Sequence, residues 1–416
     1  MEKSIVILGA GTGGTIMANR LRKKYRPDQA SITIVDQNDQ HIYQPGLLFV
    51  PFGIYSPEDI VRPRGKQLHK GIDYIQSSID TMDATDKSVT LGNGSVLSYD
   101  VLIIATGSEL LFGETEGLTG EGWRETIFDF YTLDGATALA EKLKTVESGN
   151  VVVSLTDLPI KCPVAPLEFT FLADWYFAER GVRDNINLTF VTSLDAVFTR
   201  PVAAEHLGKL MAEKNIQVVS EFNTGEVDGA SGKLISFDER EVPFDLLINI
   251  PLHGGASFIE HVPGLGDPLN FVIADNHTMQ AKNYPDIFAI GDAANLPTSK
   301  AGSVTHFEAD VLVDNIEAHL AGEELGGSFD GHANCFVETG FNKALLIDFN
   351  YETEPLPGRF PFAGGPMPLM KESRLNHLGK LMFHPIYWNM LLPGHHMPGI
   401  PTDMPVSGKK FPSEQE

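Results

Sequence analysis

Short apolar runs alternate with helical patterns along most of the chain. Residues 4–8 and 32–35 are continuous apolar runs of strand length, and residues 15–21 between them have the pattern of a helix. Strands that alternate with helices are typical of parallel sheets with both faces covered. We therefore predict an α/β fold. Further strands are expected at residues 100–107, 150–155, 188–192, 245–251 and 283–292, and further helices at residues 167–180 and 303–320.

A glycine motif lies between the first predicted strand and the first predicted helix. Gly9, Gly11 and Gly14 form the pattern G-x-G-x-x-G, and Asp36 ends the following strand. In this pattern Gly9 permits a tight turn, Gly11 lets a pyrophosphate approach the backbone, and Gly14 lets the helix meet the strand. The helix N-terminus offers free N–H groups to the phosphates. The motif predicts a dinucleotide-binding site in which Asp36 accepts hydrogen bonds from a ribose.

Composition and charge narrow the class of protein. The 416 residues include 31 Lys and Arg against 55 Asp and Glu, which gives a formal net charge of −24. A chain this acidic is not expected to bind nucleic acid, because phosphates are attracted by a basic field. The length predicts two or three domains. The first residues lack the long apolar region of a secretory signal, so we expect no signal peptide.

The C-terminal part of the chain differs from the rest in charge and polarity. Between Lys371 and Pro412 there are five basic residues against two acidic ones, and six of the eleven methionines lie between Met367 and Met404. An apolar stretch with Trp, Tyr and flanking basic residues is typical of a membrane interface. We therefore expect this region to contact a lipid bilayer surface. The alternative is a C-terminal helix that closes a core or a dimer.

The ends of two later strands resemble known motifs, which indicate the dinucleotide that binds. One strand ends in Ala105, Thr106 and Gly107, and a later one ends in Gly291 and Asp292. Both resemble the signatures of flavoproteins with two dinucleotide-binding domains. The resemblance implies that the A-T-G strand returns beneath FAD and that the aspartate binds the ribityl chain or the pyrophosphate side of FAD.

The second nucleotide site that NAD(P)H-dependent members of this class carry is altered. Its strand is present at residues 150–155, but no glycine occurs in residues 151–180. A backbone without glycine cannot wrap a pyrophosphate closely, which argues against an NADH-dependent enzyme. Cys162 stands there instead, next to Lys161 and before a helix that starts near Pro166. An adjacent cation and a helix N-terminus favour the thiolate, so we predict a reactive cysteine.

These residues lead to a family resemblance. Residues 161–166, K-C-P-V-A-P, resemble the K-C-x-x-A-P segment of the sulfide:quinone oxidoreductases, and residues 335–351 are similar to the segment that holds their second active-site cysteine. The resemblance covers nearly the whole chain, 5–392. It implies that Cys162 and Cys335 flank the flavin, oxidise sulfide to zero-valent sulfur or polysulfide, and pass electrons through FAD to a membrane quinone. Cys162 would hold the growing sulfur chain, and Cys335 would lie next to the flavin.

The chain departs from this family in two places. Most well-known members carry a third cysteine, which in some is linked covalently to FAD, whereas this chain has two cysteines in all. We therefore expect non-covalent FAD and a two-cysteine mechanism. Residues 196–201 replace a loop that contains histidine in many members, so no proton-transfer role is carried over to them. The chain is expected to belong to a divergent two-cysteine subgroup.

Other site predictions rest on position alone. Pro45 is expected to pass close to the flavin, and Gly302 to begin a helix whose N-terminus stabilises negative charge on it. The histidine pair at residues 395–396 has no spaced acid or cysteine partner, so we expect no metal site. Aromatic residues near the second cysteine are as compatible with core packing as with quinone binding. The candidates for the quinone side are Phe341, Lys343, Tyr351 and Phe362.

Sulfide oxidation coupled to quinone reduction is therefore the leading function, and two other enzymes stay open. A type II NADH:quinone dehydrogenase is opposed by the missing second glycine motif. A flavocytochrome c-type sulfide dehydrogenase subunit is opposed by the lack of an export signal and by the apolar, basic C-terminal region. A non-enzymatic flavin-binding partner would leave both cysteines idle. We expect a homo-oligomer bound peripherally, as a monotopic protein, to the cytoplasmic face of a membrane.

The predicted organisation has three parts. An FAD-binding domain takes residues 1–110 and 251–320, and a second Rossmann-like domain with Cys162 takes residues 111–250. A C-terminal region at residues 321–416 carries Cys335 together with the membrane and quinone surface.

Overall fold

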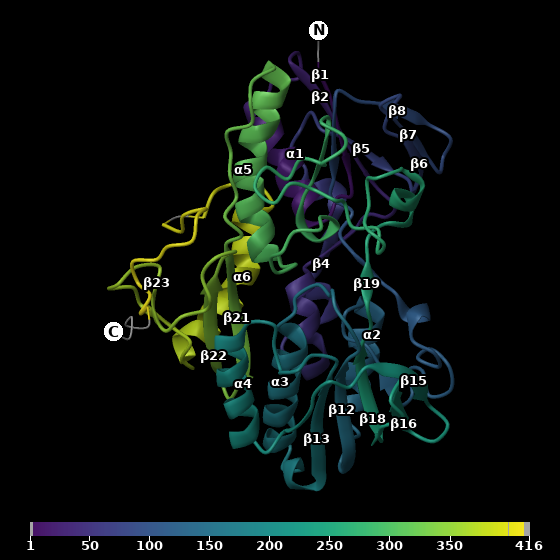
Figure 1. Cartoon of the computed structure of the whole chain (residues 1–416), viewed down its shortest axis with the longest axis vertical. Helices are drawn as coiled ribbons and strands as arrows, with labels where there is room; N and C mark the ends of the chain where they lie inside the picture. The colour runs from purple at the N-terminus through teal and green to yellow at the C-terminus, as the bar shows by residue number, and fades with distance from the viewer. Residues whose placement is uncertain (1–2, 398, 412–416) are drawn as a thin grey trace.

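Two five-stranded parallel sheets, each with helices packed on it, form the two ends of the molecule (Figure 1). The structure is a computed structural model that describes residues 3–397 and 399–411. Residue 398 and residues 412–416, which belong to the predicted C-terminal region, lie outside the described residues. The predicted α/β class with two Rossmann-like sheets is confirmed.

The first sheet has the strand order β20-β9-β1-β2-β5, and every neighbouring pair is parallel. Its central strand is buried on both faces, since Ile5, Ile7 and Leu8 have no exposed surface, which explains why the sequence shows a continuous apolar run there. The edge strand β20 joins from a distant part of the chain. The elements are β1 (Lys3–Leu8), β2 (Ala30–Asp36), β5 (Asp73–Gln76), β9 (Val101–Ile104) and β20 (Ile287–Ala289), with α1 (Thr12–Lys24) and α5 (Gly302–Ala321) packed against each other.

The second sheet has the order β11-β18-β12-β13-β14 and is also parallel throughout. Its strands come from residues 127–250, between β9 and β20 of the first sheet. The predicted domain boundaries stay a prediction; the one after residue 320 falls within the last turn of α5 (Gly302–Ala321). The elements are β11 (Ile127–Phe128), β12 (Gly149–Leu155), β13 (Ile186–Thr192), β14 (Gln217–Val219) and β18 (Leu246–Ile250), with α2 (Leu133–Leu143), α3 (Ala165–Glu179) and α4 (Pro201–Glu213).

The C-terminal region joins the two ends of the molecule along one side (Figure 1). Its hairpin of β21 (Ala333–Gly340) and β22 (Lys343–Phe349) packs through β21 on both α3 and α5, and α6 (Arg374–Ile386) packs on the hairpin. This packing brings β21 beside the loop that precedes α3. The smaller elements are β3 (Gln40–Ile42), β4 (Val61–Pro63), β6 (Ile79–Asp83), β7 (Ser88–Leu91), β8 (Val96–Ser98), β10 (Glu109–Leu110), β15 (Thr224–Asp228), β16 (Lys233–Ser236), β17 (Glu241–Pro243), β19 (His253–Gly254), β23 (Gly358–Phe360) and β24 (Met367–Leu369).

Among the described residues, no helix is both long enough and apolar enough to cross a bilayer.

Two glycines of the N-terminal motif are required by close backbone contact. Gly9 has φ +97°, and a Cβ atom there would lie 2.4 Å from the carbonyl oxygen of Ala105. A Cβ atom on Gly14 would lie 1.8 Å from the carbonyl oxygen of Gly9, because α1 starts directly against the end of β1. Gly11 differs, since a Cβ atom there would meet no described atom within 4 Å. Gly9 and Gly14 are therefore required by the fold, whereas Gly11 leaves open space beside the backbone.

We expect Gly14→Ala to affect stability and Gly11→Ala to affect dinucleotide binding. The first forces α1 away from β1 and should lower the free energy of unfolding by about 1–3 kcal/mol, as overpacking does. The second should leave the unfolding transition nearly unchanged and weaken dinucleotide binding instead, because its methyl group enters the space next to the turn. Urea unfolding and cofactor titration of both variants test this. Equal losses of stability would contradict the assignment.

Candidate flavin and cysteine site

A cavity of about 950 Å³ lies where the two sheets and the C-terminal region meet. The loops after β1, β9 and β12 reach it, together with the start of α5, strand β21 and helix α6. Gly14 lies behind the first turn and does not line it. The predicted site residues that line this cavity are Gly9, Gly11, Asp36, Pro45, Ala105, Thr106, Gly107, Cys162, Gly291, Asp292, Gly302 and Cys335.

One end of the cavity is built for a ribose and a pyrophosphate. Helix α1 begins after Gly11 with no side-chain cap and no acidic residue in its first turn, so its N–H groups are free to bind phosphate oxygens. Asp36 accepts a hydrogen bond from the Ala10 N–H at 2.8 Å, and its carboxylate lies 3.2 Å from the Arg64 guanidinium. These contacts hold the Asp36 carboxylate at the cavity wall, where a ribose hydroxyl can reach it.

The carboxyl end of β9 offers further groups to a bound molecule. The hydroxyls of Thr106 and Ser108 are buried, line the cavity, and have no hydrogen-bond partner in the described part of the chain. Buried polar atoms in native proteins are nearly always paired, so these two hydroxyls indicate a polar ligand. Together with the open space at Gly11, they fit an elongated dinucleotide such as FAD.

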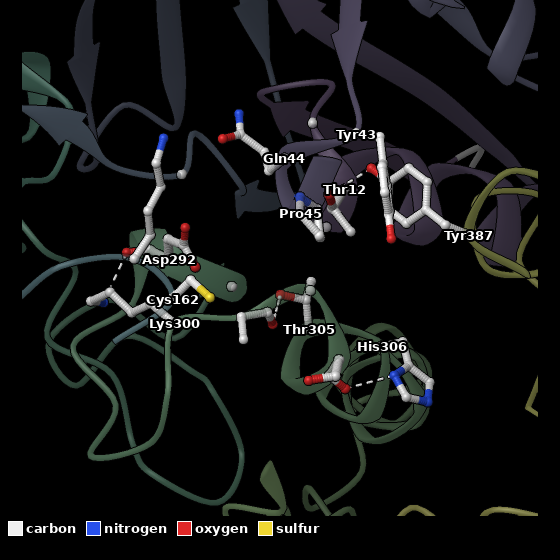
Figure 2. A pocket seen from close by; sticks show the side chains of 18 of the residues that line it. Thr12, Tyr43, Gln44, Pro45, Cys162, Asp292, Lys300, Thr305, His306 and Tyr387 are labelled. Atoms are coloured by element: carbon white, nitrogen blue, oxygen red, sulfur yellow. Dashed lines mark hydrogen bonds between the residues drawn. The ribbon is translucent and has the colours of Figure 1, made fainter. Parts of the chain in front are cut away.

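The loop after β20 forms the opposite wall (Figure 2). Lys300 donates from Nζ to the carbonyl oxygen of Asp292 at 2.9 Å and to that of Ala294 at 2.7 Å. Burial raises the pKa of Asp292, although Lys300 and Lys161 oppose this shift. The Gly291 N–H donates to Glu308 Oε2 at 2.6 Å. Burial, with a smaller effect of the Asp292 charge, raises the pKa of Glu308 to about 7.

Both cysteines line the same cavity. Cys162 lies in the loop between β12 and α3 with φ +49°, where its N–H donates to the Lys300 carbonyl at 2.6 Å and its carbonyl accepts from the Ala165 N–H at 2.9 Å. Cys335 lies on β21 and is 8% exposed. The two thiols are close enough for a charge on Cys335 to raise the pKa of Cys162. Both are free thiols.

Burial opposes the thiolate that the sequence predicts for Cys162. Burial raises the pKa of Cys162 well above its ordinary value, Glu168 adds to the rise, and the charge of Lys380 lowers it only in part. Burial also raises the pKa of Cys335 to about 11. The ammonium group of Lys161 lies 6.0 Å from the Tyr131 ring. The neighbouring cation and helix N-terminus seen in the sequence are therefore outweighed by desolvation.

A buried ion pair beside the cysteines was missed by the sequence analysis. Glu168, on the first turn of α3, has no exposed surface, and its Oε1 accepts from Lys380 Nζ at 2.7 Å and from the Glu338 N–H at 2.8 Å. Its Oε2 is buried without a partner among the described residues, and both Glu168 and Lys380 line the cavity. Glu168 stands six positions after Cys162, which was a usable signal. Lys380 is 212 positions from Glu168, so no local pattern could have found it.

The residues predicted for the quinone side are not brought together with the cysteines. None of the four lines the cavity. Phe341, in the turn of the β21–β22 hairpin, is 41% exposed, and Lys214 Nζ lies 4.6 Å from its ring centroid. Lys343 pairs with Glu372, and Tyr351 donates to the Asn276 carbonyl. Phe362 is 55% exposed.

A different apolar surface reaches the cavity. Leu375, Leu378 and Met382 lie on one face of α6, are 41%, 54% and 56% exposed, and also line the cavity. Their spacing of three and four residues places them on one helix face. Helix α6 therefore joins the cysteine cavity to the outside through an apolar mouth.

The fold and the site define a flavoprotein with two dinucleotide-binding domains, in which Cys162 stands in place of the second nucleotide motif and shares a cavity with Cys335. The sequence profile of the family described as pyridine nucleotide-disulphide oxidoreductase matches residues 3–154.

Relatives that match most of the chain identify its family. The mitochondrial sulfide:quinone oxidoreductase of Dictyostelium discoideum is 30% identical over 94% of this chain and 86% of its own length, and that of Mus musculus is 27% identical over the same shares. The crystal structure of the sulfide:quinone oxidoreductase of Aquifex aeolicus superposes with a TM-score of 0.81, at 22% identity, over 95% of this chain and 93% of that one. The protein belongs to the sulfide:quinone oxidoreductase family of flavin-dependent enzymes, as its sequence predicted.

The raised pKa of Glu308 predicts how stability depends on pH. Folding raises this pKa from an ordinary 4.5 to about 7, so the folded state prefers the protonated carboxyl. Glu308 contributes at most about 3 kcal/mol to the free energy of unfolding. This contribution is fully present below pH 4.5 and is lost as the pH rises through 7. Glu308→Gln keeps an acceptor for the Gly291 N–H and removes the titration. Its free energy of unfolding should therefore fall less than that of the wild type between pH 5 and pH 8.

Glu323→Gln, just beyond the C-terminal end of α5 and exposed, is the control and should follow the wild-type profile. Parallel profiles for the wild type and Glu308→Gln would exclude this titration.

Proposed function

We propose that the protein oxidises sulfide to polysulfide through Cys162 and Cys335 and passes the electrons through FAD to a membrane quinone. The observation that carries this proposal is that the two cysteines, far apart in the sequence, line one cavity with the residues predicted to bind FAD. Membership of the family supports the same substrate and acceptor.

Two related enzymes are less well supported. A type II NADH:quinone dehydrogenase needs a second nucleotide loop, and here the loop after β12 carries Cys162 and no glycine. A flavocytochrome c-type subunit would pass its electrons to a haem partner. The apolar mouth on α6 favours a hydrophobic acceptor that approaches from a membrane instead.

The cofactor in this proposal is non-covalent FAD. The loop after β1, Asp36 and the hydroxyls after β9 would hold its adenine, ribose and pyrophosphate half, and the loop of Gly291 and Asp292 would hold the flavin half. Both cysteines of the chain are assigned to sulfur chemistry, so neither is left to form a bond to the cofactor. Bound FAD would supply the acceptor for two electrons, which would then pass on to quinone.

Sulfur chemistry at the pair balances with these groups alone. Hydrosulfide attacks the oxidised Cys162–Cys335 bridge, which breaks the S–S bond, leaves a persulfide on Cys162 and frees the Cys335 thiolate. The proton of the hydrosulfide passes to the unpaired Oε2 of Glu168. Closing the bridge again between Cys162 and Cys335 with one extra sulfur releases two electrons, which bound FAD would accept. A second hydrosulfide attacks the middle sulfur and frees the Cys335 thiolate. This thiolate then attacks the Cys162 sulfur, which restores the two-sulfur bridge and releases HSS⁻.

The C-terminal region supports peripheral membrane binding in this proposal. The exposed apolar face of α6 is preceded by Lys371 and Arg374, a combination that suits the interface of an anionic bilayer. A quinone from the bilayer would then enter through Leu375, Leu378 and Met382 without crossing water.

Sulfide, and not NADH, should bleach the visible flavin absorbance of the purified protein under anaerobic conditions. Cys162→Ser and Cys335→Ser should each slow this bleaching about a hundredfold or more, as loss of a nucleophile does. Flavin content and unfolding temperature serve as controls, because neither substitution changes side-chain size much. Fast bleaching by NADH alone would overturn the proposal, and unchanged rates in both variants would make the cysteine pair structural.

Leu378→Glu should weaken binding to anionic vesicles and slow reduction of a water-insoluble quinone, because it places a charge on the apolar face of α6. Sulfide-driven bleaching in solution should be unaffected. Phe237→Glu is a matched control, since Phe237 is 82% exposed on the distant second domain. Vesicle co-sedimentation compares the two variants, and equal binding would argue against α6 as the contact.

A further inference from the structure

Three polar side chains, the buried Tyr387 and His41 and the half-buried Thr12, meet beside the phosphate-binding turn, and Tyr387 comes from the C-terminal region. Tyr387 directly follows α6 and is 1% exposed. Its hydroxyl lies 2.8 Å from Thr12 Oγ1 and 2.6 Å from His41 Nε2. Thr12 is the residue that follows Gly11 and begins α1. Figure 2 shows Tyr387 and Thr12 together at one side of the cavity, across from Cys162.

The contact with the C-terminal segment continues along α1. Asn19 has no exposed surface, and its Nδ2 donates to the Leu392 carbonyl at 2.7 Å. Thr12 and Asn19 are seven residues apart, which is about two helical turns, so they lie on one face of the helix. The helix that presents its N-terminus to phosphate therefore holds the segment after α6 at two points.

The direction of the hydrogen bonds in this cluster is assigned from the groups that surround His41. His41 Nδ1 is buried without a hydrogen-bond partner of good geometry in the described chain. The nearby Ala10 carbonyl, which acts to raise the pKa of His41, already accepts from Arg64 at 2.7 Å and Thr15 at 3.1 Å. An unpaired acceptor nitrogen costs less than an unpaired buried N–H, so the ring proton belongs on Nε2. Burial and the Arg64 charge lower the pKa of His41 to about 3, which keeps the ring neutral.

His41 Nε2–H then donates to the Tyr387 hydroxyl, and Tyr387 donates to Thr12 Oγ1. The Thr12 hydroxyl proton is the one left over, and both Thr12 and Tyr387 line the cavity. A chain of donors polarised in one direction strengthens its last member. The last member here stands at the N-terminus of α1, where an anion is favoured.

We propose that Tyr387 and His41 are positioning residues for the cofactor, which orient the Thr12 hydroxyl as a donor to the FAD pyrophosphate. The C-terminal segment is thereby part of the flavin-binding site. This inference rests on FAD as the bound dinucleotide, as in the proposed function, and is independent of what reduces it.

The test is a double-mutant cycle on FAD affinity, measured by titrating FAD into protein stripped of flavin. Tyr387→Phe keeps the aromatic packing and breaks the donor chain, so its Kd for FAD should rise about tenfold, as for loss of a hydrogen bond to a charged group. Thr12→Val should show a similar loss, and Thr12→Ser should bind like the wild type. The loss from Tyr387→Phe should nearly vanish in the Thr12→Val background, because the tyrosine acts through the threonine.

Tyr99→Phe is the matched control. Its hydroxyl is buried without a partner among the described residues and does not line the cavity, so its removal should leave FAD affinity unchanged. Protease resistance of the segment after α6 gives a second measurement. FAD should protect it in the wild type and in Thr12→Ser, and less in Tyr387→Phe, since coupling between binding and docking is reciprocal.

Wild-type affinity in Tyr387→Phe overturns the inference, and so do additive losses in the double variant. Failure of the wild-type protein to bind FAD would instead count against the proposed function.

Discussion

The buried ion pair of Glu168 and Lys380 holds the site together. One carboxylate oxygen joins three segments, because it accepts from Lys380 on α6 and from the Glu338 N–H on β21 while its own residue belongs to α3. Charges removed from water are tolerated only when they are paired and hydrogen-bonded. The helix after Cys162, the strand of Cys335 and the helix of the cavity mouth must therefore assemble together. The cysteines line one cavity as a consequence of that constraint.

The second parallel sheet keeps the frame of a nucleotide-binding domain and changes its use. Ligands of such sheets bind beyond the carboxyl ends of the strands, and Cys162 lies at that position after β12. The loop has a left-handed residue at Cys162 itself, tied by its N–H to Lys300 of the flavin-binding half. In the loop after β12, backbone groups that would bind phosphates are thus replaced by the thiol of Cys162, which faces the neighbouring domain.

The sequence predicted what is encoded locally and missed what depends on assembly. The turn at Gly9 to Gly14 and the helices after residues 165 and 302 follow from spacing and periodicity, and the structure has them close to where they were expected. The thiolate at Cys162 was predicted from neighbours in the chain, whereas desolvation comes from elements far away. The aromatic residues predicted to bind quinone were chosen by residue type, without knowledge of their place in the fold. The face of α6 that reaches the cavity is defined by spacing together with exposure, and exposure is not visible in a sequence.

The first sheet is interrupted by the second, since β20 joins β9 only after the whole of residues 127–250. During synthesis the inserted domain is complete on the ribosome while the flavin-binding sheet still lacks its edge strand, and the cysteine strand and α6 emerge later still. Contacts of such sequence separation form slowly. The cavity walls formed by β21 and α6 are therefore added only after the strands of both sheets have been made.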